Sequence, residues 1–246
     1  SVPIPKFNRT DPTAPDLLAD MLRSIEERSP VLKAAVTEAR AGRYAAGALE
    51  ALGEGQQDVA AFFKGLDLYL KGQFDQAATQ LNVAAGPRRE FFPGAFFLGA
   101  SLAALGRDRD AASTWQLGFG TQTRPPVAYR LFADARLRDG QPQSVVDVLQ
   151  PVWERLPTDD GIASRLATAL VLTEQFEPAL PVLDGYLTRH PDDQDALLSA
   201  ILAQYEVSTR RRARLSVDEA SRLTRWARAY RGPQRALVDR YVDALR

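Results

Sequence analysis

The residues of this chain that could do chemistry are one histidine and two pairs of neighbouring carboxylates. His190 is the only histidine among 246 residues, and the carboxylate pairs are Asp159-Asp160 and Asp192-Asp193. A catalytic triad or a multi-histidine metal centre needs a partner that the sequence does not contain. A histidine followed by proline is typical of a helix end, and paired aspartates are typical of helix starts, where carboxylates cap backbone amides. These residues therefore predict helix termini rather than a reaction centre.

Other common chemistries have no residues to carry them. The chain has no cysteine, which excludes disulfides, thiolate metal sites and a cysteine nucleophile. Its glycines are spaced along the chain and not clustered as a phosphate-binding loop requires. We therefore expect a protein that is not an enzyme and that needs no cofactor or metal.

Composition indicates a folded chain with no overall preference for a charged partner. Apolar residues make up 45%, and 31 basic residues balance 31 acidic ones. No stretch reaches the ~20 apolar residues that cross a bilayer, so we expect a soluble protein. The abundance of Arg and Ala over Lys is typical of GC-rich bacteria, and either cytoplasm or periplasm is compatible with it. The chain begins at Ser1 without methionine, which indicates a possible fragment of a longer protein; the oligomeric state stays open.

A signature that recurs every 34 residues organises the middle of the chain. One column holds Gly65, Gly99, Ala133 and Ala167; a second holds Gly72, Gly106, Gly140 and Glu174; a third holds Ala77, Ala111, Val145 and Ala179. A bulky column, Leu81, Trp115, Leu149 and Leu183, keeps the same phase. A repeat of this length indicates stacked supersecondary units that bury their apolar faces against neighbours.

The columns make physical sense as helix hairpins. First helices are expected near 58–71, 92–105, 126–139 and 160–173, and second helices near 75–85, 109–119, 143–156 and 177–190. The first column lets paired helices approach closely, and the second ends each first helix in a left-handed turn. Pro151 and Pro181 fall within second helices, so those helices should bend or begin late.

The ends of the chain are less regular. Residues 1–12 are rich in proline and predict an extended arm or linker. Residues 13–57 predict N-terminal helices with a divergent repeat, and 58–191 the four regular repeats. Residues 192–246 predict divergent helices that cap the array, including an exposed basic loop at 210–214 and a Ser216-x-x-Glu219 capping box.

In these columns the chain resembles the tetratricopeptide repeat family, closely over 58–191 and loosely over 30–57. The resemblance implies an all-α, right-handed solenoid of antiparallel helix pairs that serves as a protein-interaction module. The order of arm, repeats and arginine-rich terminal helices is also similar to the C-terminal repeat regions of some large bacterial proteins with an upstream von Willebrand-type domain.

The resemblance places a binding groove on the first helices. Phe62-Phe63 and Phe96-Phe97 are doublets one repeat apart, and by the family's pattern Phe62 or Phe96 leans into the concave face. The expected partner-binding residues are Phe62, Leu66, Tyr69, Phe96, Arg130, Asp134 and Arg138. The alternative is that both phenylalanines fill space against flanking helices, including the N-terminal one. The family's basic carboxylate clamp is missing from these positions.

Charge is distributed unevenly although its total is zero. From Tyr205 to Arg246 there are eleven arginines and five carboxylates, which leaves +6 here and −6 elsewhere. A possible basic patch consists of Arg222, Arg225, Arg228 and Arg231. It could bind an acidic partner, anionic lipid or nucleic acid, but nucleic acid is disfavoured because no aromatic residues alternate with the arginines.

The function that the sequence predicts is a non-enzymatic scaffold whose concave face binds a peptide or a partner protein. Two alternatives stay open. One is a structural module that packs on an upstream domain of the same polypeptide. The other is polyanion binding by the arginine-rich C-terminal helices.

Overall fold

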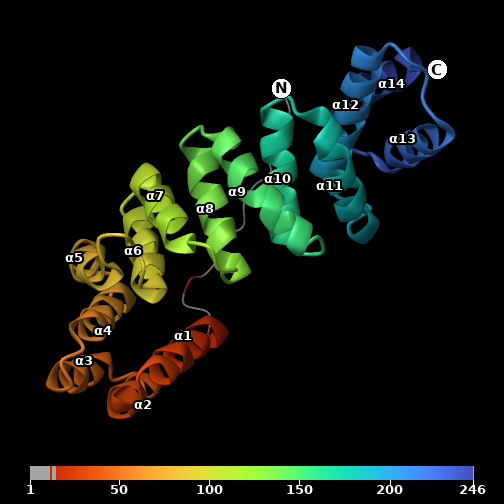
Figure 1. Ribbon diagram of the computed structural model, residues 1–246. Coiled ribbons are helices and arrows are strands. Elements are labelled where there is room, and N and C mark those ends of the chain that lie inside the picture. Colours follow the sequence, from red (N-terminus) through yellow and green to blue (C-terminus); the bar gives the residue numbers. More distant parts are fainter. Residues whose placement is uncertain (1–11, 13–14, 246) are drawn as a thin grey trace. The chain divides into compact units, whose positions relative to one another are not determined.

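The structure, a computed structural model, describes Pro12 and residues 15–245, which form helices joined by short turns (Figure 1). No strand occurs in this part of the chain, so the all-α prediction is confirmed there. The extended arm predicted for residues 1–12 lies outside the described residues, apart from Pro12.

The chain divides into two compact units, with the boundary between Asp139 and Gly140. The described helices of the first are α1 (Pro15–Arg28), α2 (Lys33–Arg40), α3 (Tyr44–Gly53), α4 (Gln57–Leu70), α5 (Phe74–Ala85), α6 (Phe92–Ala104), α7 (Asp108–Phe119) and α8 (Pro126–Arg138). Those of the second are α9 (Pro142–Arg155), α10 (Asp160–Leu172), α11 (Phe176–Arg189), α12 (Gln194–Arg211), α13 (Val217–Ala229) and α14 (Arg235–Ala244).

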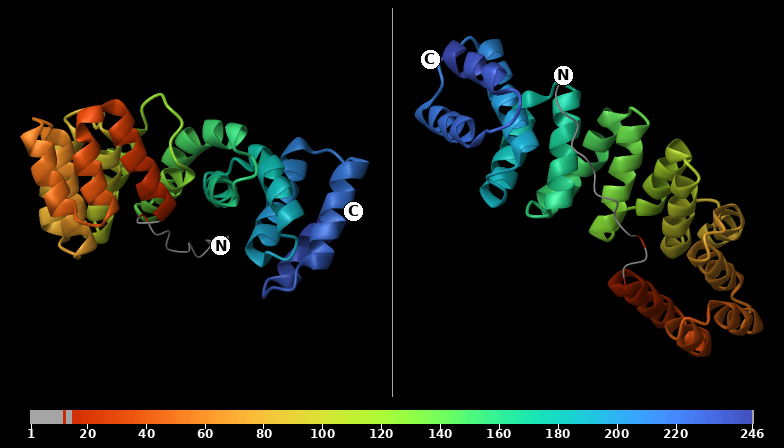
Figure 2. Two further views of the ribbon diagram at one scale, coloured as in Figure 1. Left: turned by 90° about the horizontal axis from the view of Figure 1, so that it is seen from below. Right: turned by 180° about the vertical axis from the view of Figure 1, so that it is seen from behind.

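Within each unit, every helix packs against the helices before and after it in the sequence. In the second unit α12 also contacts α14, so that α13 and α14, drawn in blue, both lie beside it (Figure 2). The rings of Tyr205 and Tyr241 stack between α12 and α14 with centroids 4.3 Å apart. The eight helices predicted for the regular repeats begin and end within one residue of the observed ones.

Close packing within the helix pairs explains the small residues of the first column. A Cβ added to Gly65 of α4 would lie 2.4 Å from Leu81 Cγ of α5. One added to Gly99 of α6 would lie 2.3 Å from Trp115 Nε1 of α7. Such separations are well inside van der Waals contact. The small and bulky columns therefore pack against each other in these two pairs, and the predicted close approach of the paired helices occurs there.

The turn that follows each first helix has a left-handed residue, as the second column predicts. Gly72, Gly106 and Gly140 have φ angles of 77°, 76° and 70°. Glu174 has a φ of 56° although it is not a glycine. A side chain in this conformation costs roughly 1–2 kcal/mol, because Cβ crowds the following carbonyl. Arg210 binds both the backbone carbonyl of Glu174 (3.3 Å) and its carboxylate (3.2 Å).

Two details of the second unit differ from expectation, the first of them in part. Pro151 lies inside α9 and Pro181 inside α11, so of the two expected outcomes, a bend or a late start, the late start does not occur. Proline removes one amide donor, but its fixed φ is compatible with a helix.

The second difference is that α12 continues through Arg210 and Arg211, where a basic loop was predicted. Arginines in the last turn interact favourably with the helix dipole, and these two also find carboxylates. Arg211 pairs with Glu177 at 2.8 Å and with Glu219 at 2.9 Å. The helix ends at Arg211, and the C-cap residue that follows, Arg212, has a φ of 52°.

Candidate functional site

The phenylalanine doublets predicted to line a groove are in the core of the first unit. Phe62 and Phe96, and their neighbours Phe63 and Phe97, all have exposed fractions of 0%. The expectation that Phe62 or Phe96 reaches the surface is therefore wrong. The alternative, that they fill space between helices, agrees with the burial.

The reason for this burial is an aromatic cluster that the turn before α6 and the N-terminal helix complete. The Phe62 ring meets Phe97 at 6.0 Å and meets Phe91, in that turn, edge-on at 5.8 Å. The guanidinium of Arg28, at the end of α1, lies 5.1 Å from the centre of the Phe91 ring. Arg28 also forms a 2.6 Å ion pair with Asp58 of α4. These contacts cover the Phe62 ring, which was expected to line a groove.

The neighbours of Phe62 do not form a surface either. Leu66 is 0% exposed. Tyr69 is half-buried, with its ring edge-on to Phe74 and to Phe97 at 5.4 and 5.5 Å. Both residues therefore contribute packing area within the first unit.

The three charged residues predicted to continue the groove lie on α8 in different environments. Asp134 is buried, Arg130 is half-buried and Arg138 is exposed. Arg138 binds both carboxylate oxygens of Asp108, at 3.1 and 2.9 Å, and this pairing raises the pKa of the guanidinium. Asp108 opens α7, so Arg138 connects two neighbouring helix pairs and is not free to bind a ligand.

The predicted basic patch is also partly engaged. Arg225 pairs with Asp184 at 3.4 Å, and Arg231 donates to the carbonyls of Arg228 and Tyr230 at the end of α13. Arg222 is half-buried, and Arg228 is exposed. Arg225 therefore links α13 to α11, and Arg231 binds the last carbonyls of its own helix, which weakens the case for a polyanion site.

His190 and the acidic pairs lie at helix termini, as the sequence predicts. Asp159 and Asp193 accept hydrogen bonds from the amides of Ile162 (2.9 Å) and Ala196 (3.0 Å) as N-caps. His190 lies 2.6 Å from Asp160, across one repeat.

The carboxylate of Asp160 is held by its two basic neighbours. Burial acts to raise its pKa, but the hydrogen bonds from His190 and Arg189 outweigh burial, and the pKa is lowered. The ring of Tyr186 lies against His190 at 4.7 Å. Burial and a hydrogen bond to Asp193 raise the pKa of the Tyr186 hydroxyl. These groups form a network that connects neighbouring turns.

Among the described residues, no group of three or more acidic or histidine side chains is placed to hold a metal ion.

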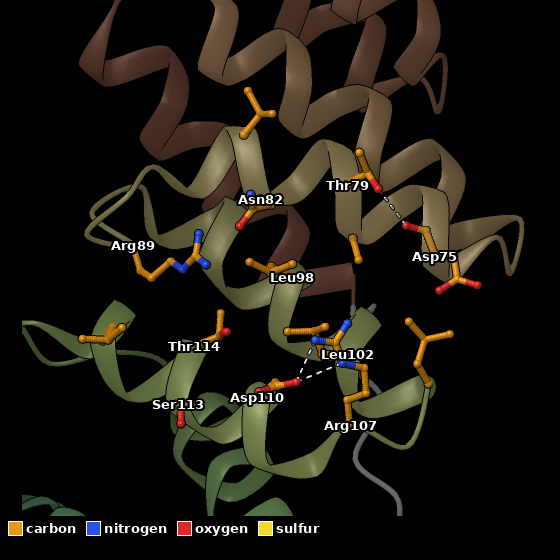
Figure 3. A pocket seen from close by; sticks show the side chains of 14 residues that line it. Asp75, Thr79, Asn82, Arg89, Leu98, Leu102, Arg107, Asp110, Ser113 and Thr114 are labelled. Atoms are coloured by element: carbon orange, nitrogen blue, oxygen red, sulfur yellow. Dashed lines mark hydrogen bonds and ion pairs between the residues drawn. The ribbon is translucent and has the colours of Figure 1, made fainter.

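A surface that could receive a partner lies elsewhere in the first unit, between α5 and α7. A cavity of about 740 Å³ opens there, with α6 as its floor (Figure 3). Leu98, Leu102 and Leu105 of α6 form the base of this groove. Val83 of α5 and Leu117 of α7 flank it with exposed fractions of 62% and 60%. We call this surface the α5/α7 groove.

Polar side chains line the walls of the α5/α7 groove. They are Thr79 and Asn82 of α5 and Ser113 and Thr114 of α7. Apolar residues at the base with hydroxyl and amide groups above them are typical of binding sites. In such sites a ligand gains affinity by burying apolar surface, and hydrogen bonds fix its orientation.

The two ends of the groove carry opposite charges. Asp75 lies at the start of α5 and Arg89 beyond its end, at opposite sides of the cavity in Figure 3. Within the described part of the chain, the Asp75 carboxylate has no cationic partner, and the Arg89 guanidinium donates to the backbone carbonyl of Gly86 at 3.2 Å. Arg107 and Asp110 form an ion pair of 2.7 Å at the start of α7.

The apolar base distinguishes this repeat from its neighbours. One repeat earlier, the positions of Leu98 and Leu105 hold Lys64 and Lys71. One repeat later, the position of Leu102 holds Arg136. Among the four regular repeats only this one has leucine at all three positions, and every residue of α6 from Phe92 to Leu102 is buried.

The sequence itself contains a signal for the residues that flank the groove. Leu49, Val83 and Leu117 are spaced by 34 residues, one on each of α3, α5 and α7. Their exposed fractions are 70%, 62% and 60%. A large apolar residue that recurs at an outward position of the second helices indicates a surface and not a core.

Comparison with models of known protein families gives no match, and comparison with curated proteins gives none either. Within the described residues, no helix has both the length and the apolar character needed to cross a membrane.

Proposed function

We propose that this chain is a non-enzymatic interaction scaffold, a right-handed solenoid of tetratricopeptide-like helix pairs that binds a peptide or partner protein. The observation that carries the proposal is the α5/α7 groove, where Val83 and Leu117 hold exposed apolar area beside a leucine base. Apolar surface of this kind on a folded protein marks a site of association, because covering it is favourable.

The regular part of the repeat supports the same proposal. The residues of the shared columns pack helices together or form turns: Gly65 packs against Leu81, and Gly72 lies at a left-handed turn. Arrays built in this way present a fixed surface, so a partner binds without the entropic cost of ordering the site. The concave face drawn from the family resemblance is replaced by the surface between second helices, because Phe62 and Phe96 are buried.

The experiment that tests the proposal is affinity capture from a native lysate with a matched pair of variants. Val83→Asp combined with Leu117→Asp places two charges beside the groove at positions that are more than half exposed. The control, Val31→Asp combined with Leu70→Asp, alters residues of the same unit that are 52% and 47% exposed and lie outside the groove.

We expect the wild type and the control to retain the same partner and the groove variant to lose it. Circular dichroism of all three proteins checks that the fold is intact. Retention of every partner by a folded groove variant would show that the α5/α7 groove is not the binding surface.

A further inference from the structure

The direction of the helices that form the α5/α7 groove restricts what can occupy it. Short turns join α5 to α6 and α6 to α7, so α5 and α7 run in the same direction with α6 antiparallel beneath them. Both carboxyl ends therefore lie at the Arg89 end of the groove, and both amino ends lie at the Asp75 end.

The dimensions of the groove fit one short helix. α5 and α7 have 12 residues each, which corresponds to a length of about 18 Å at 1.5 Å per residue. A helix of about three turns has that length and places apolar residues i, i+3 or i+4, and i+7 on one face. Such an apolar face would pack mainly against Val83 and Leu117, which are 62% and 60% exposed, because Leu98 and Leu102 of the base are only 3% and 7% exposed.

We propose that the α5/α7 groove binds an amphipathic helix of a partner protein, antiparallel to α5 and α7, with acidic residues in its first turn and basic residues in its last. This inference rests on the proposed scaffold function and specifies the chemistry and polarity of the partner.

Charge complementarity sets the orientation. The amino end of the bound helix lies beside the carboxyl ends of α5 and α7, where the dipoles attract. Arg89 is at this end, so acidic residues in the partner's first turn meet a cation and also stabilise their own helix. At the other end, basic residues in the last turn meet the Asp75 carboxylate. The opposite orientation places the dipoles parallel, so only this one satisfies dipoles and side chains together.

The test uses two synthetic helical peptides of about 14 residues with blocked termini and the same apolar face. The forward peptide carries Glu in its first turn and Lys in its last, and the reversed peptide exchanges these charges. Fluorescence anisotropy measures the binding of each peptide to the full chain. We expect the forward peptide to bind at least about tenfold more tightly at low salt, where charge pairs are least screened.

Two protein variants separate recognition by the groove from the intrinsic helicity of the peptides. Arg89→Glu combined with Asp75→Lys should invert the preference, because the charges at both ends of the groove are exchanged. Val83→Asp combined with Leu117→Asp should weaken both peptides at least about tenfold, whereas the control Val31→Asp with Leu70→Asp should weaken neither.

The outcomes distinguish the orientation from the scaffold function. Equal binding of the two peptides, with both lost in the groove variant, overturns the orientation and leaves the scaffold function standing. An unchanged preference in the charge-exchanged protein, or binding that the groove variant does not weaken, also overturns the inference. Absence of binding by both peptides at about millimolar concentration overturns it too, while affinity capture tests the scaffold function independently. If light scattering shows a dimer that the groove variant dissociates, the occupant is a second copy of this chain and the inference fails.

Discussion

Replacing Gly99 by alanine tests whether close helix packing, and not helix propensity, explains the glycine of the repeat. An added Cβ would lie 2.3 Å from Trp115 Nε1 and 2.4 Å from its Cε2. Ordinary contacts of a Cβ are 3.4–4 Å, so the indole must move by about 1 Å. The indole is 1% exposed, and its Nε1 donates a 2.9 Å hydrogen bond to the carbonyl of Phe96.

The magnitude follows from three contributions. Overpacking a core costs typically 1–3 kcal/mol. Lengthening the bond of a buried indole N–H adds about 1 kcal/mol. Alanine recovers about 1 kcal/mol of helix propensity relative to glycine. We therefore expect Gly99→Ala to lower the free energy of unfolding by about 2 kcal/mol.

Two other glycines serve as controls. An added Cβ at Gly53, in the last turn of α3, or at Gly185, inside α11, meets nothing within 4 Å. At both sites alanine should stabilise the protein, by up to about 1 kcal/mol. Gly53 lies in the same unit as Gly99, so this pair is compared within one unfolding transition.

Urea denaturation followed by circular dichroism measures all three variants. A double-mutant cycle adds Trp115→Ala: once the indole is removed, Gly99→Ala should become stabilising, with a coupling of about 2–3 kcal/mol. If Gly99→Ala is as stable as Gly53→Ala, or if the cycle is additive, then contact with Trp115 is not the reason for the glycine.

Three further predictions concern local features of the second unit. Glu174 has a φ of 56°, which glycine adopts without strain and alanine does not. Both Glu174→Gly and Glu174→Ala remove the contact of the carboxylate with Arg210, so the glycine variant should be more stable by about 1 kcal/mol in urea denaturation. Equal stabilities would contradict this account. The Ser216 amide donates to the Glu219 carboxylate and, with Arg211, outweighs burial to lower the pKa of Glu219 below its ordinary 4.5. This stabilisation should be complete above about pH 4.5 and be lost as the pH falls through the lowered pKa, so Glu219→Gln should flatten the dependence of unfolding free energy on pH in that range. Ser216→Ala should cost about 1 kcal/mol at neutral pH, and a loss near zero would show that the capping box is not needed.

The helices could be predicted from the sequence because local and repeat signals agree. Gly106 marks a turn both by its conformational freedom and by its position in the 34-residue column, and its φ is 76°. Ser216 and Glu219 form the capping box that their spacing predicts. Such features depend on residues nearby in the sequence or on a residue one repeat away. Both can be read from the sequence.

The surface could not be predicted in the same way, because burial of a first-helix residue depends on contacts outside the repeat. Phe62 has a position that the family resemblance assigns to a groove, but Phe91 and Phe97 enclose it. Phe91 stands in the turn before α6, and Arg28, which covers it, belongs to a helix that precedes the regular repeats. Phe97 lies one repeat after Phe63, but no 34-residue column contains the contacts made by Phe91 and Arg28.

The positions that the repeats share and the positions in which they differ therefore have different roles. Gly99 and Trp115 fit together as their counterparts Gly65 and Leu81 do, and this fit is the same whatever the chain binds. Specificity for a partner must come from positions where one repeat departs from the others. One such departure is the leucine row of α6, which lies beside open apolar area: Leu98 itself is 3% exposed, whereas Val83 and Leu117, which flank the row, are 62% and 60% exposed. In the proposed scaffold, the shared columns build the array and the positions where one repeat departs from the others supply specificity for a partner.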